Sequence, residues 1–136
     1  HRAYHNIGNL LMKEKKCKEA MEAFKNALRN RKTKIIDGLA KKYDYLDVDY
    51  IQRLFNLYGT RVEYILKNVS SIDDLGLHFG RDLYQVEVDY LMQEEFALYP
   101  EDVLERRTKL YLFLDYDKIE NLDNYMQKKK KVRLKI

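Results

Sequence analysis

Residue types that commonly carry out chemistry are few in this chain, and their spacing does not group them. His1 and His5 are four residues apart and could share a helix face that binds a metal ion, but no third ligand is near them in sequence. Cys17 has no histidine placed to activate it as a nucleophile. Glu94 and Glu95 are adjacent, so on a helix they point about 100° apart and cannot act as a catalytic carboxylate pair. We therefore predict no catalytic and no metal-binding residue.

Glycine-rich nucleotide-binding motifs are also missing from the sequence. It contains neither G-x-G-x-x-G nor G-x-x-x-x-G-K-[ST], so we predict no cofactor-binding residue and no cofactor held by this chain. The single cysteine excludes a disulfide framework and fits an intracellular, reducing compartment. The apolar run at 111–114 is far shorter than the roughly 20 residues of a membrane span. The chain begins with His1, and we expect it to be part of a longer protein.

Charge is distributed in three blocks along the 136 residues. Residues 1–34 have a net charge of +7, residues 35–127 have −9, and residues 128–136 have +6. The last block is a plain lysine run without interleaved aromatic residues, so nucleic acid is not an expected partner. Contact of this basic tail with an anionic membrane surface is one prediction, and a frayed chain end is the alternative.

The elements expected to position these residues are helices. With 46% hydrophobic residues the chain can bury a core, and one proline with five glycines is too few for a protein built from hairpins. Apolar residues recur at helical spacing throughout, so we predict an all-α fold, with an antiparallel helical hairpin followed by a small orthogonal helical bundle. The expected helices cover 3–14, 18–30, 35–43, 49–58, 60–69, 84–98, 100–114 and 117–126, with a loop at 70–80.

The N-terminal segment resembles one tetratricopeptide repeat. Its packing positions are matched by Tyr4, Ile7, Gly8, Ala20, Phe24 and Ala27 at the offsets of that family. The resemblance implies a helical hairpin domain over residues 1–33 that turns at 15–17. If the hairpin binds a partner peptide, the contact face would hold His5, Asn9 and Met12, whereas the alternative is a hairpin that only packs.

A second resemblance covers residues 34–127. The stretch D-V-L-E-R-R-T-K-L-Y-L-F-L-D at 102–115 resembles a helix of the C-terminal helical domain of FAD-dependent glycerol-3-phosphate dehydrogenase and its oxidase relatives. V-E-V-D-Y at 86–90 and Y-G-T-R at 58–61 resemble further motifs of that domain, in the same order. The domain organisation is therefore a hairpin at 1–33, this domain at 34–127 and a basic tail at 128–136.

This resemblance implies an accessory portion of an oxidoreductase that is not catalytic by itself. The whole enzyme would convert sn-glycerol 3-phosphate to dihydroxyacetone phosphate and pass electrons through FAD to quinone. FAD and the substrate would bind a separate flavin domain, which is the expected partner of this chain. The parent would be a peripheral protein of the mitochondrial inner membrane or the bacterial cytoplasmic membrane. The alternative function is a tetratricopeptide-type module for protein–protein interaction.

Two adjacent arginines are the candidate contact residues of the second domain. Arg106 and Arg107 could face the flavin domain or a phosphate group, because a guanidinium matches both carboxylate and phosphate. Alternatively they pair with Glu87, Glu94 or Glu95 on a neighbouring helix and fix its register.

Overall fold

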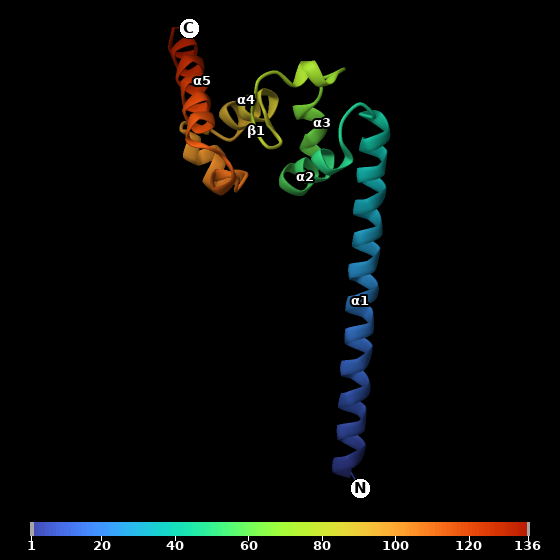
Figure 1. The fold of residues 1–136 in the computed structure, drawn as a ribbon. Coiled ribbons are helices and arrows are strands. Elements are labelled where there is room, and N and C mark those ends of the chain that lie inside the picture. Colours follow the sequence, from blue (N-terminus) through green and yellow to red (C-terminus); the bar gives the residue numbers. More distant parts are fainter. Residues whose placement is uncertain (1, 136) are drawn as a thin grey trace. The chain divides into compact units, whose positions relative to one another are not determined.

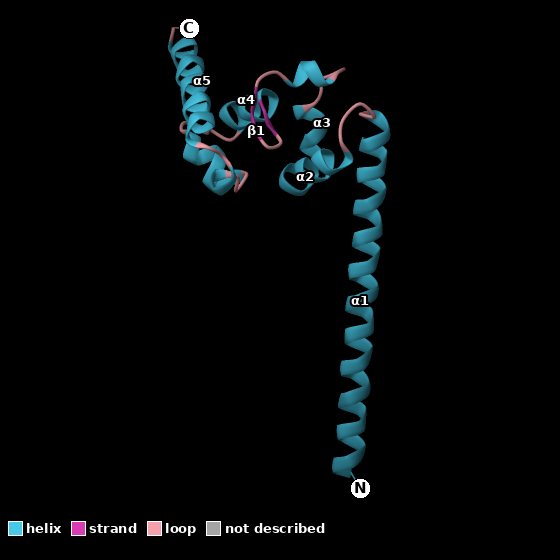
Figure 2. Ribbon diagram, viewed as in Figure 1, coloured by secondary structure: helices cyan, strands magenta, loops and turns pink. Residues whose placement is uncertain are grey.

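The computed structural model describes residues 2–135, with side chains described from residue 6 onward. The chain divides into two compact units, residues 1–42 and 43–136, and each is described by itself below. Helices dominate both units, which confirms the all-α prediction (Figure 2).

The first unit is one continuous helix. Helix α1 spans Arg2–Lys42 without interruption (Figure 1). The predicted hairpin at 1–33 is therefore wrong, as is the separate helix predicted at 35–43. Lys15, Lys16 and Cys17 supply no glycine or proline to end a helix, and lysine is a good helix former. The apolar periodicity was real, but it does not reveal whether two periodic segments are joined.

Two further residues explain the failure of the hairpin prediction. A Cβ atom built on Gly8 would meet nothing within 4 Å, so Gly8 marks no close approach of two helices. The Thr33 hydroxyl donates to the carbonyl oxygen of Arg29 at 3.0 Å, one turn earlier, instead of capping a new helix. The structural boundary accordingly falls between residues 42 and 43, not near residue 33.

The second unit contains short helices and one small hairpin. In chain order its elements are α2 (Val48–Tyr58), α3 (Val62–Ile65), strand β1 (His78–Gly80), strand β2 (Leu83–Tyr84), α4 (Gln85–Glu94) and α5 (Tyr116–Leu134). Single 3₁₀ turns occupy Gly59–Arg61, Ile72–Leu75 and Tyr111–Phe113, and Asp102–Arg107 form a π-helical segment.

Helix α2 begins and ends where its sequence predicts. The Asp47 side chain accepts a 3.2 Å hydrogen bond from the Asp49 amide, which caps the N-terminus. Gly59 follows the last turn with a φ of 59°, a left-handed conformation that costs glycine little. The sequence T-R-V-E at 60–63 has the spacing of a capping box, but Thr60 lies inside a 3₁₀ turn and does not cap α3. A capping box is formed instead by Ser71 and Asp74.

The hairpin replaces part of the predicted loop at 70–80. Strands β1 and β2 pair antiparallel, with His78 opposite Tyr84 and Gly80 opposite Leu83. Two paired strands of three and two residues are too short to show period-two alternation in sequence. Their presence leaves the fold class unchanged.

The core of the second unit is made by residues from every part of it. Helix α5 contributes Leu122 and Met126 and continues to Leu134, so most of the predicted basic tail at 128–136 is helical. The side chains without solvent exposure are Ile51, Leu54, Val62, Leu66, Leu83, Glu87, Val88, Val103, Leu104, Leu122 and Met126. Glu87 is the one charged residue in this set, which directs attention to its partners.

Candidate functional site

A buried ion-pair cluster joins α2 to the first turn of α4. Arg53 donates from Nη1 to Oε1 of Glu87 at 3.1 Å and from Nη2 to Oε2 at 2.6 Å. The Tyr58 hydroxyl donates to Oε1 of Glu87 at 2.7 Å. Arg53 also donates to the Asp82 carbonyl oxygen at 2.8 Å. Both carboxylate oxygens of Glu87 are thus engaged by side chains of α2.

Burial and charge act together on the groups around Glu87. Burial tends to lower the pKa of Arg53, but the hydrogen bond and the charge of Glu87 more than offset it, so the Arg53 pKa is raised. Burial, followed by the charge of Glu87, raises the pKa of Tyr58. Arg53 therefore remains charged and Tyr58 remains a neutral donor. This cluster connects α2 to α4 and leaves no carboxylate oxygen free for a substrate.

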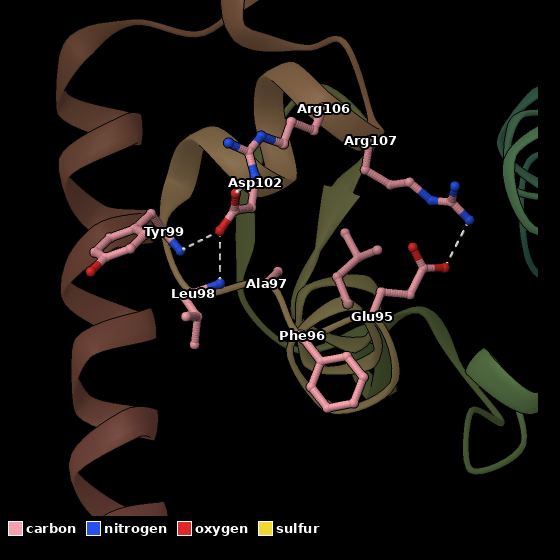
Figure 3. A pocket seen from close by; sticks show the side chains of 9 residues that line it. Glu95, Phe96, Ala97, Leu98, Tyr99, Asp102, Arg106 and Arg107 are labelled. Carbon is pink, nitrogen blue, oxygen red and sulfur yellow. Dashed lines mark hydrogen bonds and ion pairs between the residues drawn. The ribbon is translucent and has the colours of Figure 1, made fainter.

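A second cluster lines an open pocket of about 510 Å³ (Figure 3). It is built from the end of α4, the connection 95–101 and the π-helical segment, and it contains both predicted arginines. The lining residues are Leu91, Glu95, Phe96, Ala97, Leu98, Tyr99, Asp102, Arg106 and Arg107.

Arg107 is held in this pocket by three contacts. Its Nη2 donates to Oε1 of Glu95 at 2.7 Å and to the Leu57 carbonyl oxygen at 3.4 Å. Its guanidinium carbon lies 5.1 Å from the centre of the Tyr58 ring. Glu95 was one of the carboxylates predicted as a partner of the two arginines. Of the other two predicted partners, Glu87 is paired with Arg53 instead, and Glu94 accepts a hydrogen bond from the Tyr64 hydroxyl at 2.9 Å.

Arg106 and Asp102 form the other ion pair of the pocket. Nη1 of Arg106 is 2.9 Å from Oδ1 of Asp102, and the Arg106 side chain is 81% exposed. Oδ2 of Asp102 accepts from the amides of Leu98 and Tyr99 at 2.9 and 3.1 Å (Figure 3). Chiefly the Leu98 amide, and then the Tyr99 amide and Arg106, lower the Asp102 pKa against the opposing effect of burial. Each arginine of the pocket is thus neutralised by its own carboxylate.

Phe96 is a feature of the pocket that sequence reasoning did not find. Its φ of 58° is unusual for a bulky residue, and its side chain is 78% exposed. The amide of the next residue, Ala97, bonds back to the Leu91 carbonyl at 3.0 Å, so the chain reverses sharply at the end of α4. No glycine marks this reversal, and a sequence pattern therefore gives no signal for it.

Comparison with known proteins decides what this domain is. Residues 23–130 match the family model described as the C-terminal domain of alpha-glycerophosphate oxidase. The chain belongs to this family. The match confirms the resemblance noted over 34–127 and extends it backward into α1.

Several bacterial dehydrogenases are similar to this chain. The chain is 43% identical over 88 residues to a glycerol-3-phosphate dehydrogenase of Pseudomonas tolaasii and 43% identical over 93 residues to one of Pseudomonas aeruginosa. It is 34% identical over 93 residues to a D-erythritol 1-phosphate dehydrogenase of Brucella abortus. These alignments cover 65%, 68% and 68% of this chain, but only 17%, 18% and 16% of the relatives. The chain thus spans less than a fifth of their length.

The peptide-contact residues predicted on the first unit do not form a site. Asn9 and Met12 are exposed on α1, and the side chain of His5 lies outside the described residues. The concave face of a tetratricopeptide repeat requires two packed helices, and α1 is a single one. The single helix α1 therefore replaces the predicted tetratricopeptide hairpin, and Asn9 and Met12 have no groove to line.

The described residues offer neither a metal site nor a membrane span. None of their His, Cys, Asp and Glu side chains gather in groups of three or more that could hold a metal ion. Within the same residues, no helix has the length and apolar character needed to cross a bilayer.

Proposed function

We propose that this chain is the accessory C-terminal helical portion of a flavin-dependent sn-glycerol 3-phosphate dehydrogenase. The whole protein would form dihydroxyacetone phosphate and pass electrons through FAD to quinone. The observation that carries the proposal is the family match over residues 23–130 together with the small share of each relative that the chain spans. The two 43% identities to glycerol-3-phosphate dehydrogenases, against 34% to the erythritol-phosphate enzyme, favour the three-carbon substrate.

The residues of this chain do not fit a flavin site. Both pocket arginines are already paired with carboxylates, at 2.7 Å for Arg107 and 2.9 Å for Arg106. A pyrophosphate or substrate phosphate would have to displace Glu95 or Asp102 to reach them. The sequence has no glycine-rich phosphate-binding motif either, so we propose that FAD and the substrate phosphate bind a separate flavin domain of the whole protein.

The flavin domain is the proposed partner of the apolar segment 111–116. Its side chains are strongly exposed: Leu112 by 88%, Tyr116 by 79%, Phe113 by 58% and Tyr111 by 43%. Such a group of exposed apolar side chains in six residues is costly unless another surface covers it. More than four-fifths of each relative lies outside the matched region, so ample chain exists to cover it.

We also propose that the parent attaches peripherally to the mitochondrial inner membrane or to the bacterial cytoplasmic membrane. The exposed Lys128, Lys131 and Lys135 near the end of α5 support it, while Lys129 is engaged by Asp89 at 3.4 Å. Lipid binding by the chain should then fall when the three exposed lysines are replaced by glutamine. Equal co-sedimentation of the unaltered chain and the glutamine variant with phosphatidylserine vesicles would show that the basic tail does not attach the protein to a membrane.

The test of the proposed function is a substrate comparison on the full-length protein. Dye reduction is measured with sn-glycerol 3-phosphate and with D-erythritol 1-phosphate, and then with a ubiquinone analogue as acceptor. We expect kcat/KM to be highest for glycerol 3-phosphate and the quinone to accept the electrons. No oxidation of either polyol phosphate by a flavin-loaded protein would overturn the proposal.

A further inference from the structure

The exposed face of α1 has a repeat that the enzyme function does not explain. Positions alternating three and four residues apart run from residue 7 to residue 35 along one stripe of the helix, which is the a/d seam of a coiled coil. Seven of these nine positions are apolar: Ile7, Leu10, Cys17, Met21, Phe24, Leu28 and Ile35. The two polar members are Glu14 and Arg31.

No side chain in the described part of the first unit covers this seam. Every residue from 6 to 35 is exposed, including Phe24 at 66% and Leu10 at 65%. The seam is about 42 Å long at the rise of an α-helix. Long isolated helices gain most of their stability from packing an apolar face, so a helix of this length needs a partner along the stripe.

The charges in the seam identify the partner. When a second α1 is laid antiparallel so that residue numbers in each layer add up to 45, Glu14 lies opposite Arg31 of the second copy. The remaining layers in this register pair Met21 with Phe24, Leu28 with Cys17, and Ile35 with Leu10. A single register thus places the two charged residues opposite each other. It also places six of the seven apolar seam residues opposite one another, whereas the seventh, Ile7, lies opposite Gly38 at the end of the seam. A parallel pair would instead place Glu14 against Glu14 and Arg31 against Arg31.

The residues beside the seam are compatible with this arrangement. Ala20 and Ala27 occupy flanking positions and would face each other across the pair, where small side chains allow close approach. The lysines that flank the seam at 13, 18, 25, 32 and 34 have no acidic counterpart there, and Lys18 already pairs with Glu14 at 3.6 Å. Their mutual repulsion opposes the dimer at low ionic strength and is screened by salt.

We propose that α1 is the dimerisation element of this protein, forming an antiparallel coiled coil with a second copy of the chain. The Glu14–Arg31 layers, two in the symmetric dimer, set the register and orientation. The inference does not rest on the enzymatic proposal, because it uses only the α1 sequence and its exposure.

Cysteine cross-linking of the full 136-residue chain tests the orientation. Leu28→Cys should form a disulfide-linked dimer through Cys17 of the other copy, while the unaltered chain should not cross-link, because its two Cys17 residues lie in different layers. Lys16→Cys, on the opposite face of α1, is the matched control and should stay uncross-linked. A Cys17–Cys17 disulfide in the unaltered chain would indicate a parallel pair and overturn the proposal.

Charge exchange tests the register independently of any cysteine. Sedimentation velocity should show a dimer whose dissociation constant falls as the salt concentration rises from about 0.1 to about 0.5 M. Salt at these concentrations screens the repulsion between the exposed lysines. Arg31→Glu should weaken dimerisation at least about tenfold, equivalent to about 1.4 kcal/mol, and Glu14→Arg combined with Arg31→Glu should restore it. A monomer under all conditions would overturn the proposal, as would a monomer that binds phosphatidylserine vesicles through Phe24 and Leu28.

Discussion

The Tyr58 hydroxyl donates a 2.7 Å hydrogen bond to Oε1 of Glu87. The Glu87 carboxylate has no solvent exposure, and it also accepts hydrogen bonds from both terminal nitrogens of Arg53. Removing the charge from Glu87 leaves a buried guanidinium without its partner. We expect Glu87→Gln to lower the free energy of unfolding by about 3–5 kcal/mol. Glu105→Gln, at an exposed position, should change it by less than about 0.5 kcal/mol.

Urea unfolding followed by tyrosine fluorescence measures this difference. The chain has no tryptophan, and of its 12 tyrosines only Tyr4 lies in the first unit, so the signal reports on the second. Equal midpoints for the two glutamine variants would show that the Glu87 cluster does not hold α2 and α4 together.

The two pocket arginines should differ in their effect on stability. Arg107 bonds Glu95 and stacks on Tyr58, whereas Arg106 is 81% exposed and pairs with Asp102 within its own segment. We expect Arg107→Ala to cost about 1–2 kcal/mol, less than a fully buried charged hydrogen bond because of its partial exposure. Arg106→Ala should cost less than about 0.5 kcal/mol. A larger loss for Arg106 in urea unfolding would contradict the geometry of the pocket.

Asp102 should contribute a pH-dependent part of the stability. Its pKa is lowered in the folded state, chiefly by the Leu98 amide, so the folded protein binds the proton less readily than the unfolded chain does. The contribution is therefore complete above the ordinary aspartate pKa of about 4 and is lost as the pH falls through the lowered value. We expect Asp102→Asn to reduce the slope of stability against pH in this acidic range, measured by urea unfolding between about pH 5 and pH 2. An unchanged slope would indicate that the Asp102 carboxylate does not hold these amides.

Two glycines should respond to alanine in opposite directions. Gly8 lies inside α1 with open space where a Cβ would be, so Gly8→Ala should raise helix stability by about 0.5–1 kcal/mol. Gly80 has a φ of 118°, and a Cβ there would lie 2.4 Å from Cδ2 of Leu114. Gly80→Ala should therefore destabilise the second unit by about 1–3 kcal/mol. Circular dichroism melting compares the two variants. Destabilisation by Gly8→Ala would support a packed hairpin instead of a single helix.

The sequence was most informative where a local signal fixes a local structure. Asp47 and Gly59 mark the two ends of α2 because a side-chain cap and a left-handed exit depend only on neighbouring residues. The motifs at 86–90 and 102–115 could likewise be compared with the family from sequence alone, because each is a short continuous stretch of the chain.

The parts that sequence reasoning missed depend on contacts between distant residues or on the absence of a signal. Arg53 lies 34 residues before Glu87, and nothing in its surroundings marks it as the partner. The segment at 15–17 was interpreted as a turn by analogy with a repeat family, although its residues favour a continuing helix. Phe96 adopts a positive φ without glycine, so the sharp end of α4 could be found only in the structure.

The flavin content and activity of two protein samples test the central claim most directly. Residues 1–136 and the full-length protein that contains them are purified in parallel, and each is assayed for flavin absorbance and for oxidation of sn-glycerol 3-phosphate. We expect bound FAD and activity in the full-length protein and neither in residues 1–136. Flavin retained by residues 1–136, or a full-length protein that binds no flavin, would contradict it.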